Sequence, residues 1–178
     1  MRVMRVLTRA NLGGPTRQAI ALWHAHRELG LATLLATGEV GGDEAPLTPA
    51  DAGVPALGWD EALRRGPEAE GWVVVPHLGR GVAPLADLRA GRALSALLAQ
   101  HRPDVVHTHT SKAGWVGRRA ADRAGVPVLA HTFHGHVLKD YFGGSARQML
   151  SHFIERDEID AHELDALLKL IHDKKKNR

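Results

Sequence analysis

Short apolar runs alternate with longer amphipathic segments along the first 144 residues of the chain. The short runs, rich in Val, Leu and Ala, are typical of strands buried on both faces, and they cover residues 3–8, 31–37, 72–76, 104–107 and 126–131. The helical segments cover residues 15–29, 84–101 and 113–124, and residues 38–71, rich in Gly, Pro, Asp and Glu, are predicted to be loop with one short helix near residues 59–64. This alternation predicts an α/β fold with a doubly wound parallel sheet.

Glycines predict where two helices end, and leucines predict which side of the longest helix is buried. Gly30 and Gly125 directly follow two of the helical segments, where a glycine commonly ends a helix. The longest helix, residues 84–101, carries five leucines that we expect to face the sheet: Leu85, Leu88, Leu94, Leu97 and Leu98.

Polar segments follow three of the predicted strands. They span residues 11–16, 107–112 and 131–136, and they contain five of the twelve histidines. In the usual strand order 3-2-1-4-5, the first and fourth strands are neighbours where the order reverses, and ligands bind beyond the carboxyl ends of the strands at that point. The sequence therefore predicts that the three segments form one ligand-binding rim.

Each segment also has a purely structural interpretation. Gly13 and Gly14, before Pro15, form either a tight turn into a helix or a cradle for a phosphate at the helix N-terminus. The segment has neither a GxGxxG fingerprint nor a following P-loop lysine, which argues against a nicotinamide cofactor. His107 and His109 are either solvated residues at the strand end or part of the rim.

Lys112 and the spacing of the histidines indicate which ligands the rim could bind. Lys112 starts a predicted helix, where a cation is unfavourable unless an anion lies nearby. The histidines lack HExxH or Cys/His spacing, so we expect no metal site.

Composition excludes several classes of protein. The chain has no cysteine and no run of about 18 apolar residues, which favours a cytoplasmic protein without a membrane span. A net charge of +3 is too small an excess to indicate binding to nucleic acid. Only 4% of the residues are aromatic, so aliphatic side chains must build the core.

Four segments carry a distinctive set of motifs: RVLTRANLGGPTRQAIAL, PHLGRGVAPLADLRA, RPDVVHTHTSKAGWVGRRAADRAGVPVLAHTFHGH and YFGG. Over about residues 1–144 they resemble the N-terminal, acceptor-side domain of the retaining, family-four-like glycosyltransferases of the GT-B fold. The resemblance implies a Rossmann-like domain that mainly holds the acceptor. A second domain, with a Glu-x7-Glu motif, would mainly hold a nucleotide-sugar donor. The resemblance implies neither a cofactor nor a divalent metal.

The resemblance also assigns roles to individual residues. Gly13 and Gly14 match the loop that approaches the donor diphosphate. His134 matches the histidine of the HGH motif, which implies a catalytic contact beside the transferred sugar. The other matches form a polar rim for substrate and donor binding, and they are His107, His109, Lys112 and His136.

Residues 145–178 depart from this resemblance and are predicted to form a separate helical tail. Two apolar stripes predict two short amphipathic helices, and they consist of Met149, Leu150, Phe153 and Ile154, then Leu164, Leu167, Leu168 and Ile171. The segment MLSHFIERDEIDAHELDALLKLIHDKKK resembles the dimerising C-terminus of penicillinase-repressor-type regulators. The tail is either a cap on the sheet domain or a surface for a homodimer, and the chain is a split enzyme, a truncation or a fusion.

Two functions of different class follow. The first is the acceptor-side domain of a glycosyltransferase, transferring sugar from a nucleotide sugar to a glycan or lipid-linked acceptor of the cell envelope. This enzyme would work in the cytoplasm or at the inner face of the membrane.

The short tail predicts that sugar transfer by this chain requires a donor domain from another chain. About 34 residues follow Gly144, too few for a donor domain, so we expect little transfer by this chain alone and a donor-domain partner chain. Glu155 and Glu163 have the Glu-x7-Glu spacing, but no strand precedes them, and we interpret the pair as coincidence. The alternative function is a non-catalytic binding or assembly module with a helical dimerisation tail.

Overall fold

The computed structural model describes residues 1–41, 44–81 and 83–132, which all belong to one compact unit, Met1–His134. The strands are β1 (Arg2–Leu7), β2 (Ala32–Thr37), β3 (Ala56–Leu57), β4 (Gly71–Val74), β5 (Val105–His109) and β6 (Val128–Thr132). The helices are α1 (Gly14–Glu28), α2 (Trp59–Arg65), α3 (Pro84–His101) and α4 (Ser111–Arg123), with a 3-10 turn, η1 (Gly66–Glu68). The predicted boundary at residue 144 and the predicted tail lie outside the described residues.

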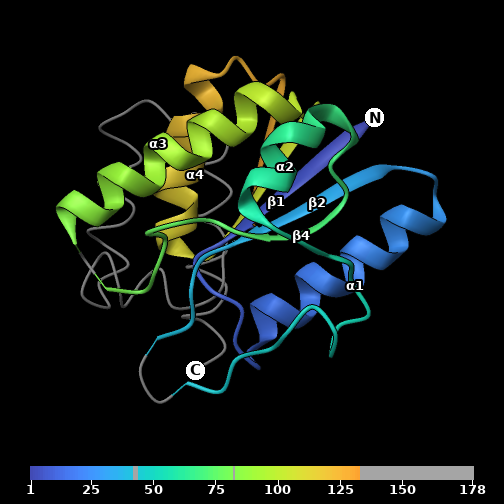
Figure 1. Cartoon of the computed structure of the whole chain (residues 1–178), viewed down its shortest axis with the longest axis horizontal. Helices are drawn as coiled ribbons and strands as arrows, with labels where there is room; N and C mark the ends of the chain where they lie inside the picture. The colour runs from blue at the N-terminus through green and yellow to red at the C-terminus, as the bar shows by residue number, and fades with distance from the viewer. Residues whose placement is uncertain (42–43, 82, 133–178) are drawn as a thin grey trace, which may run out of the picture. The chain divides into compact units, whose positions relative to one another are not determined.

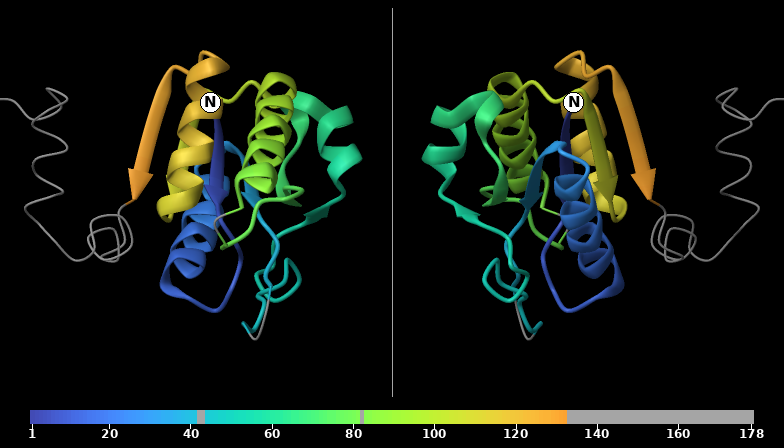
Figure 2. Two further views of the ribbon diagram at one scale, coloured as in Figure 1. Left: turned by 90° about the vertical axis from the view of Figure 1, so that its left-hand side faces the viewer. Right: turned by 90° about the vertical axis from the view of Figure 1, so that its right-hand side faces the viewer.

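All six strands are parallel and lie in the order β3-β4-β2-β1-β5-β6. Figure 2 shows β5 and β6 side by side and pointing the same way. The predicted order of the five long strands is therefore confirmed, with β1 and β5 adjacent at the reversal. The two-residue strand β3 was missed because two residues are too few to show any periodicity.

Helices cover both faces of the sheet (Figure 1). On one face, Met4 and Val6 of β1 belong to a buried cluster that includes residues of α3 and α4. On the other face, Leu7 packs in a second cluster with Ala19 and Trp23 of α1. Because successive residues of a strand point to opposite faces, the nearly continuous apolar run of β1 serves both clusters.

Helix α3 has the predicted bounds, but its buried stripe is narrower than predicted. Leu94, Leu97 and Leu98 are at most 2% exposed, whereas Leu85 and Leu88 are 73% and 53% exposed. The prediction for these two leucines is wrong because the stripe runs through Ala90 at helical spacing, and residues two and five positions earlier lie on the other side of the helix.

Two glycines end helices as predicted. After α1, Gly30 has φ +72°, its N–H donates to the Arg27 carbonyl, and the Leu31 N–H donates to the His26 carbonyl. After α4, Gly125 has φ +66° and takes part in the same pair of bonds. This double closure is the Schellman motif, and the left-handed backbone at its centre favours glycine.

No helix within residues 1–41, 44–81 and 83–132 is long and apolar enough to cross a membrane.

Candidate functional site

The first part of the site is the turn between β1 and α1. Gly13 is the N-cap of α1, Gly14 is its first residue and Pro15 lies in the first turn. The Gly13 N–H donates to Asn11 Oδ1 at 3.3 Å. A Cβ on Gly14 would meet no described atom within 4 Å. The glycine pair thus forms the predicted tight turn and leaves open space beside the start of the helix. Its role as a phosphate cradle stays a prediction.

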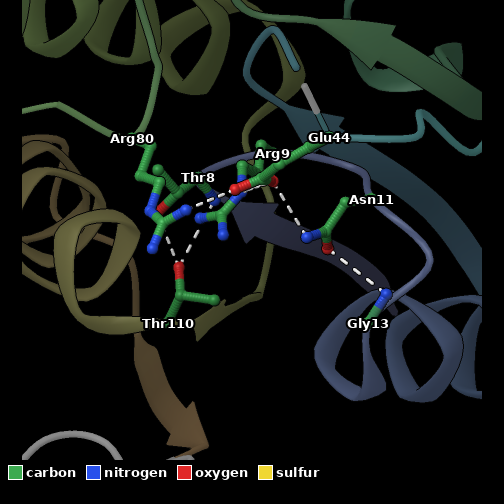
Figure 3. Close-up of polar contacts among 7 residues, drawn as sticks. All are labelled: Thr8, Arg9, Asn11, Gly13, Glu44, Arg80 and Thr110. Atoms are coloured by element: carbon green, nitrogen blue, oxygen red, sulfur yellow. Dashed lines mark hydrogen bonds and ion pairs between the residues drawn. The ribbon is translucent and has the colours of Figure 1, made fainter. Parts of the chain in front are cut away.

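A cluster of charged residues lies beside this turn (Figure 3). Arg9 follows β1, Arg80 follows β4, and Glu44 comes from the connection between β2 and β3. Arg9 Nε forms an ion pair with Glu44 Oε2, and Arg80 Nη1 lies 2.5 Å from Glu44 Oε1. Asn11 Nδ2 also donates to Glu44 Oε2, at 3.0 Å. The hydrogen bonds and charges of the two arginines lower the pKa of Glu44, so its carboxylate is ionised at neutral pH.

Two threonines join the end of β1 to the start of α4. Thr8 Oγ1 lies 2.6 Å from Thr110 Oγ1, and the Ala113 N–H donates to Thr8 Oγ1 at 3.1 Å. This satisfies one of the backbone donors that every helix N-terminus leaves without an intrahelical partner. Thr110 has φ +69°, which is a strained conformation for a β-branched residue. The contacts with Thr8 hold that backbone in place at the carboxyl edge of the sheet.

His107 and His109 lie within β5 and not in a loop after it. Their ring centroids are 4.1 Å apart, and His107 Nε2 lies 2.7 Å from Thr132 Oγ1 of β6. His109 is fully buried, so the interpretation as solvated residues is wrong for it. Burial, Arg5 and His26 all lower the pKa of His107. His107 is therefore a neutral hydrogen-bonding group at neutral pH.

His131, within β6, lies on the opposite face of the sheet from His107. His131 Nδ1 lies 2.7 Å from Thr108 Oγ1, and its ring packs against Gly114 of α4. Since Thr108 and His107 are consecutive strand residues, their side chains lie on opposite faces of the sheet. The described rim histidines, His107, His109 and His131, are thus divided between two faces at the same end of the sheet.

Lys112 lies in the first turn of α4, as predicted, and has an anion beside it. Its ammonium group pairs with Asp87 of α3 and donates to the Gly81 carbonyl. Both charged side chains are largely buried, with 15% and 13% exposed. The carboxylate of Asp87 explains how a cation is tolerated at a helix N-terminus. Binding of a ligand by Lys112 stays a prediction.

Sequence analysis missed Arg9, Glu44 and Arg80. Arg9 lies two residues after the end of β1, at the predicted binding edge, and that position was a usable signal, whereas Arg80 lies six residues after the end of β4 and gave a weaker one. Glu44 lies in a long connection without periodicity, so its place could not be predicted. His134 and His136 lie outside the described residues. Within residues 1–41, 44–81 and 83–132, no group of three or more His, Asp or Glu side chains could hold a metal ion.

Comparisons with known proteins were made for the whole chain. The family model described as "Glycosyl transferase 4-like domain" matches residues 13–158. The Escherichia coli UDP-Gal:alpha-D-GlcNAc-diphosphoundecaprenol alpha-1,3-galactosyltransferase is 43% identical over 65 residues, which are 36% of this chain and 17% of that protein. The crystal structure of MurG from Acinetobacter baumannii matches with a TM-score of 0.46 and 17% identity, covering 73% of this chain and 33% of that one.

Proposed function

Since the chain belongs to the glycosyl transferase 4-like domain family, we propose that it is the acceptor-side part of a GT-B enzyme that transfers sugar from a nucleotide sugar. The observation that carries the proposal is the family match over residues 13–158. That match includes the Gly13–Gly14 turn and the whole polar segment 107–112 at the end of β5. The parallel sheet and its reversal between β1 and β5 provide the edge at which such a ligand binds.

The chemistry of this edge suits the leaving group of the reaction. Breaking the bond between sugar and nucleotide diphosphate leaves negative charge on the diphosphate, and fixed donors or cations must stabilise that charge. The start of α1 offers backbone N–H groups and the positive end of a helix dipole beside the open side of Gly14. We assign Gly13 and Gly14 to this task.

The remaining predicted residues take supporting roles in the proposal. His134 contacts the transferred sugar, with His136 beside it in the same motif. His107 presents a neutral imidazole next to Thr132, and His109, fully buried behind it, sets its orientation. Lys112, paired with Asp87, holds α4 against α3 at the edge of the site.

The name of the Escherichia coli relative suggests the substrates. That protein is named for a UDP-galactose donor and an acceptor with a sugar on diphosphoundecaprenol. We propose the corresponding classes here, a nucleotide diphosphate sugar and a lipid-linked diphosphate acceptor at the inner face of the membrane. A donor-domain partner chain, or a second copy bound through residues 145–178, completes the assembly.

The test places a charge at Gly14. In Gly14→Glu, a carboxylate at the first position of α1 favours the helix but repels a diphosphate, and the new Cβ meets no described atom within 4 Å. We expect Gly14→Glu to bind UDP and UDP-sugars at least about tenfold more weakly in calorimetry, with an unchanged or raised melting temperature. Gly14→Gln, which has the same size without the charge, is the control.

Two outcomes would contradict the proposal. Equal binding by Gly14→Glu and Gly14→Gln would remove the start of α1 from the site. Absence of binding to every nucleotide sugar and lipid diphosphate tested would favour the non-catalytic module instead. In a multiple-turnover assay of the chain alone we expect little transfer, and sustained turnover that His134→Ala abolishes would show that this chain suffices.

A further inference from the structure

Two arginines from different strand ends meet at one carboxylate. Arg9 follows the central strand β1, and Arg80 follows β4, yet both guanidinium groups contact Glu44 (Figure 3). They use different oxygens of the carboxylate, since Arg9 binds Oε2 and Arg80 binds Oε1. Asn11 donates a further hydrogen bond to Oε2. Four side chains thus converge from three connections of the sheet.

The donors around Glu44 match the needs of a phosphate group. Guanidinium groups form charge-assisted hydrogen bonds to carboxylates and phosphates alike, with the same fork geometry. The cluster carries two positive charges and one negative charge. Removing the Glu44 carboxylate from it would leave two guanidinium groups and an amide facing one point. That set of donors suits a group with several negative oxygens.

The position of the cluster links it to the start of α1. Asn11, which donates to Glu44, also accepts a hydrogen bond from the Gly13 N–H at the N-cap of the helix. The arginines are therefore next to the turn in which backbone donors favour an anion. The side chain of Arg80 is 72% exposed, while those of Arg9 and Glu44 are 20% and 21% exposed. A ligand can reach the cluster from the side of Arg80.

We propose that Arg9, Asn11 and Arg80 form a binding site for a diphosphate group, and that Glu44 competes with the ligand for this site as an internal anion. The carrier of the diphosphate, nucleotide or lipid, rests on the proposed function, whereas the binding of the anion does not. A diphosphate must displace the carboxylate to gain both arginines. Glu44 thereby lowers the affinity for diphosphates and disfavours single phosphates, which gain less from the exchange.

Removing the negative charge of Glu44 tests the competition. Glu44→Gln keeps the size of the side chain, so we expect it to bind inorganic pyrophosphate at least about threefold more tightly than the natural chain in calorimetry. Glu61→Gln is the matched control, because Glu61 also pairs with an arginine, Arg65, on the surface helix α2. It should bind pyrophosphate like the natural chain. Unchanged or weaker binding by Glu44→Gln would overturn the competition.

Neutralising Arg80 tests the site itself. Arg80→Gln changes an exposed side chain and loses one charge-assisted contact, so we expect pyrophosphate binding to weaken about tenfold. In Arg80→Gln combined with Glu44→Gln, the gain from the second change should be smaller than in the natural background. Arg65→Gln is the control for loss of a surface arginine. Equal pyrophosphate binding by Arg80→Gln and the natural chain would overturn the site.

Two further probes distinguish the carriers. UDP represents the nucleotide, and farnesyl diphosphate in detergent micelles represents the lipid. The carrier that the site serves should show the same threefold gain in Glu44→Gln and the same tenfold loss in Arg80→Gln. If pyrophosphate responds to both changes but neither carrier binds, the anion site stands and the proposed function fails. If UDP binds without responding to either change, the site is overturned while the proposed function stands.

Discussion

A fully buried arginine, Arg5, lies under α1 and has no carboxylate partner among the described residues. Arg5 Nη1 donates to Thr33 Oγ1 at 3.1 Å, and Nη2 lies 2.9 Å from His26 Nδ1. Burial lowers the pKa of Arg5 to about 10, so it stays charged at neutral pH. The same charge, together with burial, lowers the pKa of His26 and His107. The cation is thus accommodated by keeping two neighbouring imidazoles neutral.

Fully or partly buried histidines make the stability of the domain sensitive to acid. His101 is fully buried, with Nδ1 2.9 Å from the Gly66 carbonyl and no hydrogen-bond partner for Nε2 among the described residues. Burial lowers its pKa from the ordinary 6.5, as it does for His26 and His107. Below pH 6.5 the unfolded chain binds protons that the folded chain does not. The stabilisation is therefore complete above pH 6.5 and is lost as the pH falls toward the folded-state pKa values.

We expect the free energy of unfolding of the full chain, measured with urea, to fall between about pH 7.5 and pH 5.5, by up to about 1.4 kcal/mol for each unit by which a histidine pKa is lowered. His101→Gln keeps a hydrogen-bond donor but does not titrate, so its decrease should be smaller. A decrease of the same size in His101→Gln would show that other groups cause the acid sensitivity.

Glycines set how closely helix α4 approaches its neighbours. A Cβ on Gly114 would lie 2.5 Å from Cε1 of His131, so α4 and β6 fit together only because that position lacks a side chain. A Cβ on Gly91 of α3 would lie 3.7 Å from Val116 Cγ1, which is ordinary contact. The two glycines occupy similar helical positions but have opposite consequences for substitution.

We expect Gly114→Ala to destabilise the domain by about 1–3 kcal/mol, because the ring of His131 must move away from Thr108. Gly91→Ala should be neutral or stabilise the domain by up to about 1 kcal/mol, through better helix propensity without a clash. Urea unfolding of both variants checks the pair. Equal effects of the two substitutions would show that the contact between Gly114 and His131 does not limit the packing of α4.

The elements that could be predicted from the sequence are those whose start and end are set by residues within or next to the element. Pro84 starts α3 and Pro103 interrupts the chain just after it, so local chemistry alone predicted both ends of this helix. The order of the long strands followed from a general rule about parallel sheets. The contacts of Glu44 and the burial of His109 depend on residues distant in the chain, and no local pattern contains them. The same holds for Leu85 and Leu88, whose exposure depends on how α3 is rotated against the sheet.

At the scale of the whole molecule, three strand ends meet at Gly38. Its N–H donates to the Leu7 carbonyl at the end of β1, and the N–H of Glu39 donates to the carbonyl of Leu78, which follows β4. A Cβ on Gly38 would lie 2.0 Å from the Leu78 oxygen and 2.2 Å from the Thr8 oxygen. Both neighbours are backbone atoms, so no side chain can move aside. The segments that carry Arg9 and Arg80 are therefore held together through this glycine.

We expect Gly38→Ala to destabilise the domain by about 3 kcal/mol or more, since it forces backbone segments apart, and to weaken pyrophosphate binding. Gly79→Ala is the control, because a Cβ on Gly79, beside Leu78, meets no described atom within 4 Å. Thermal unfolding and pyrophosphate calorimetry of both variants provide the measurement. Normal stability of Gly38→Ala would contradict the crowding at this junction.

The central place of β1 has a consequence for how the protein is made. Within this domain, β1 leaves the ribosome before the other elements, and β2 soon pairs with one of its edges. Its other edge pairs with β5, where Val3 lies opposite Val105, so that edge has no partner of its own sheet until the ribosome has made most of the described domain. Unpaired strand edges invite association with other chains. The nascent chain is therefore most exposed to misassembly between the synthesis of β2 and that of β5, and slower translation of this stretch lengthens the exposure.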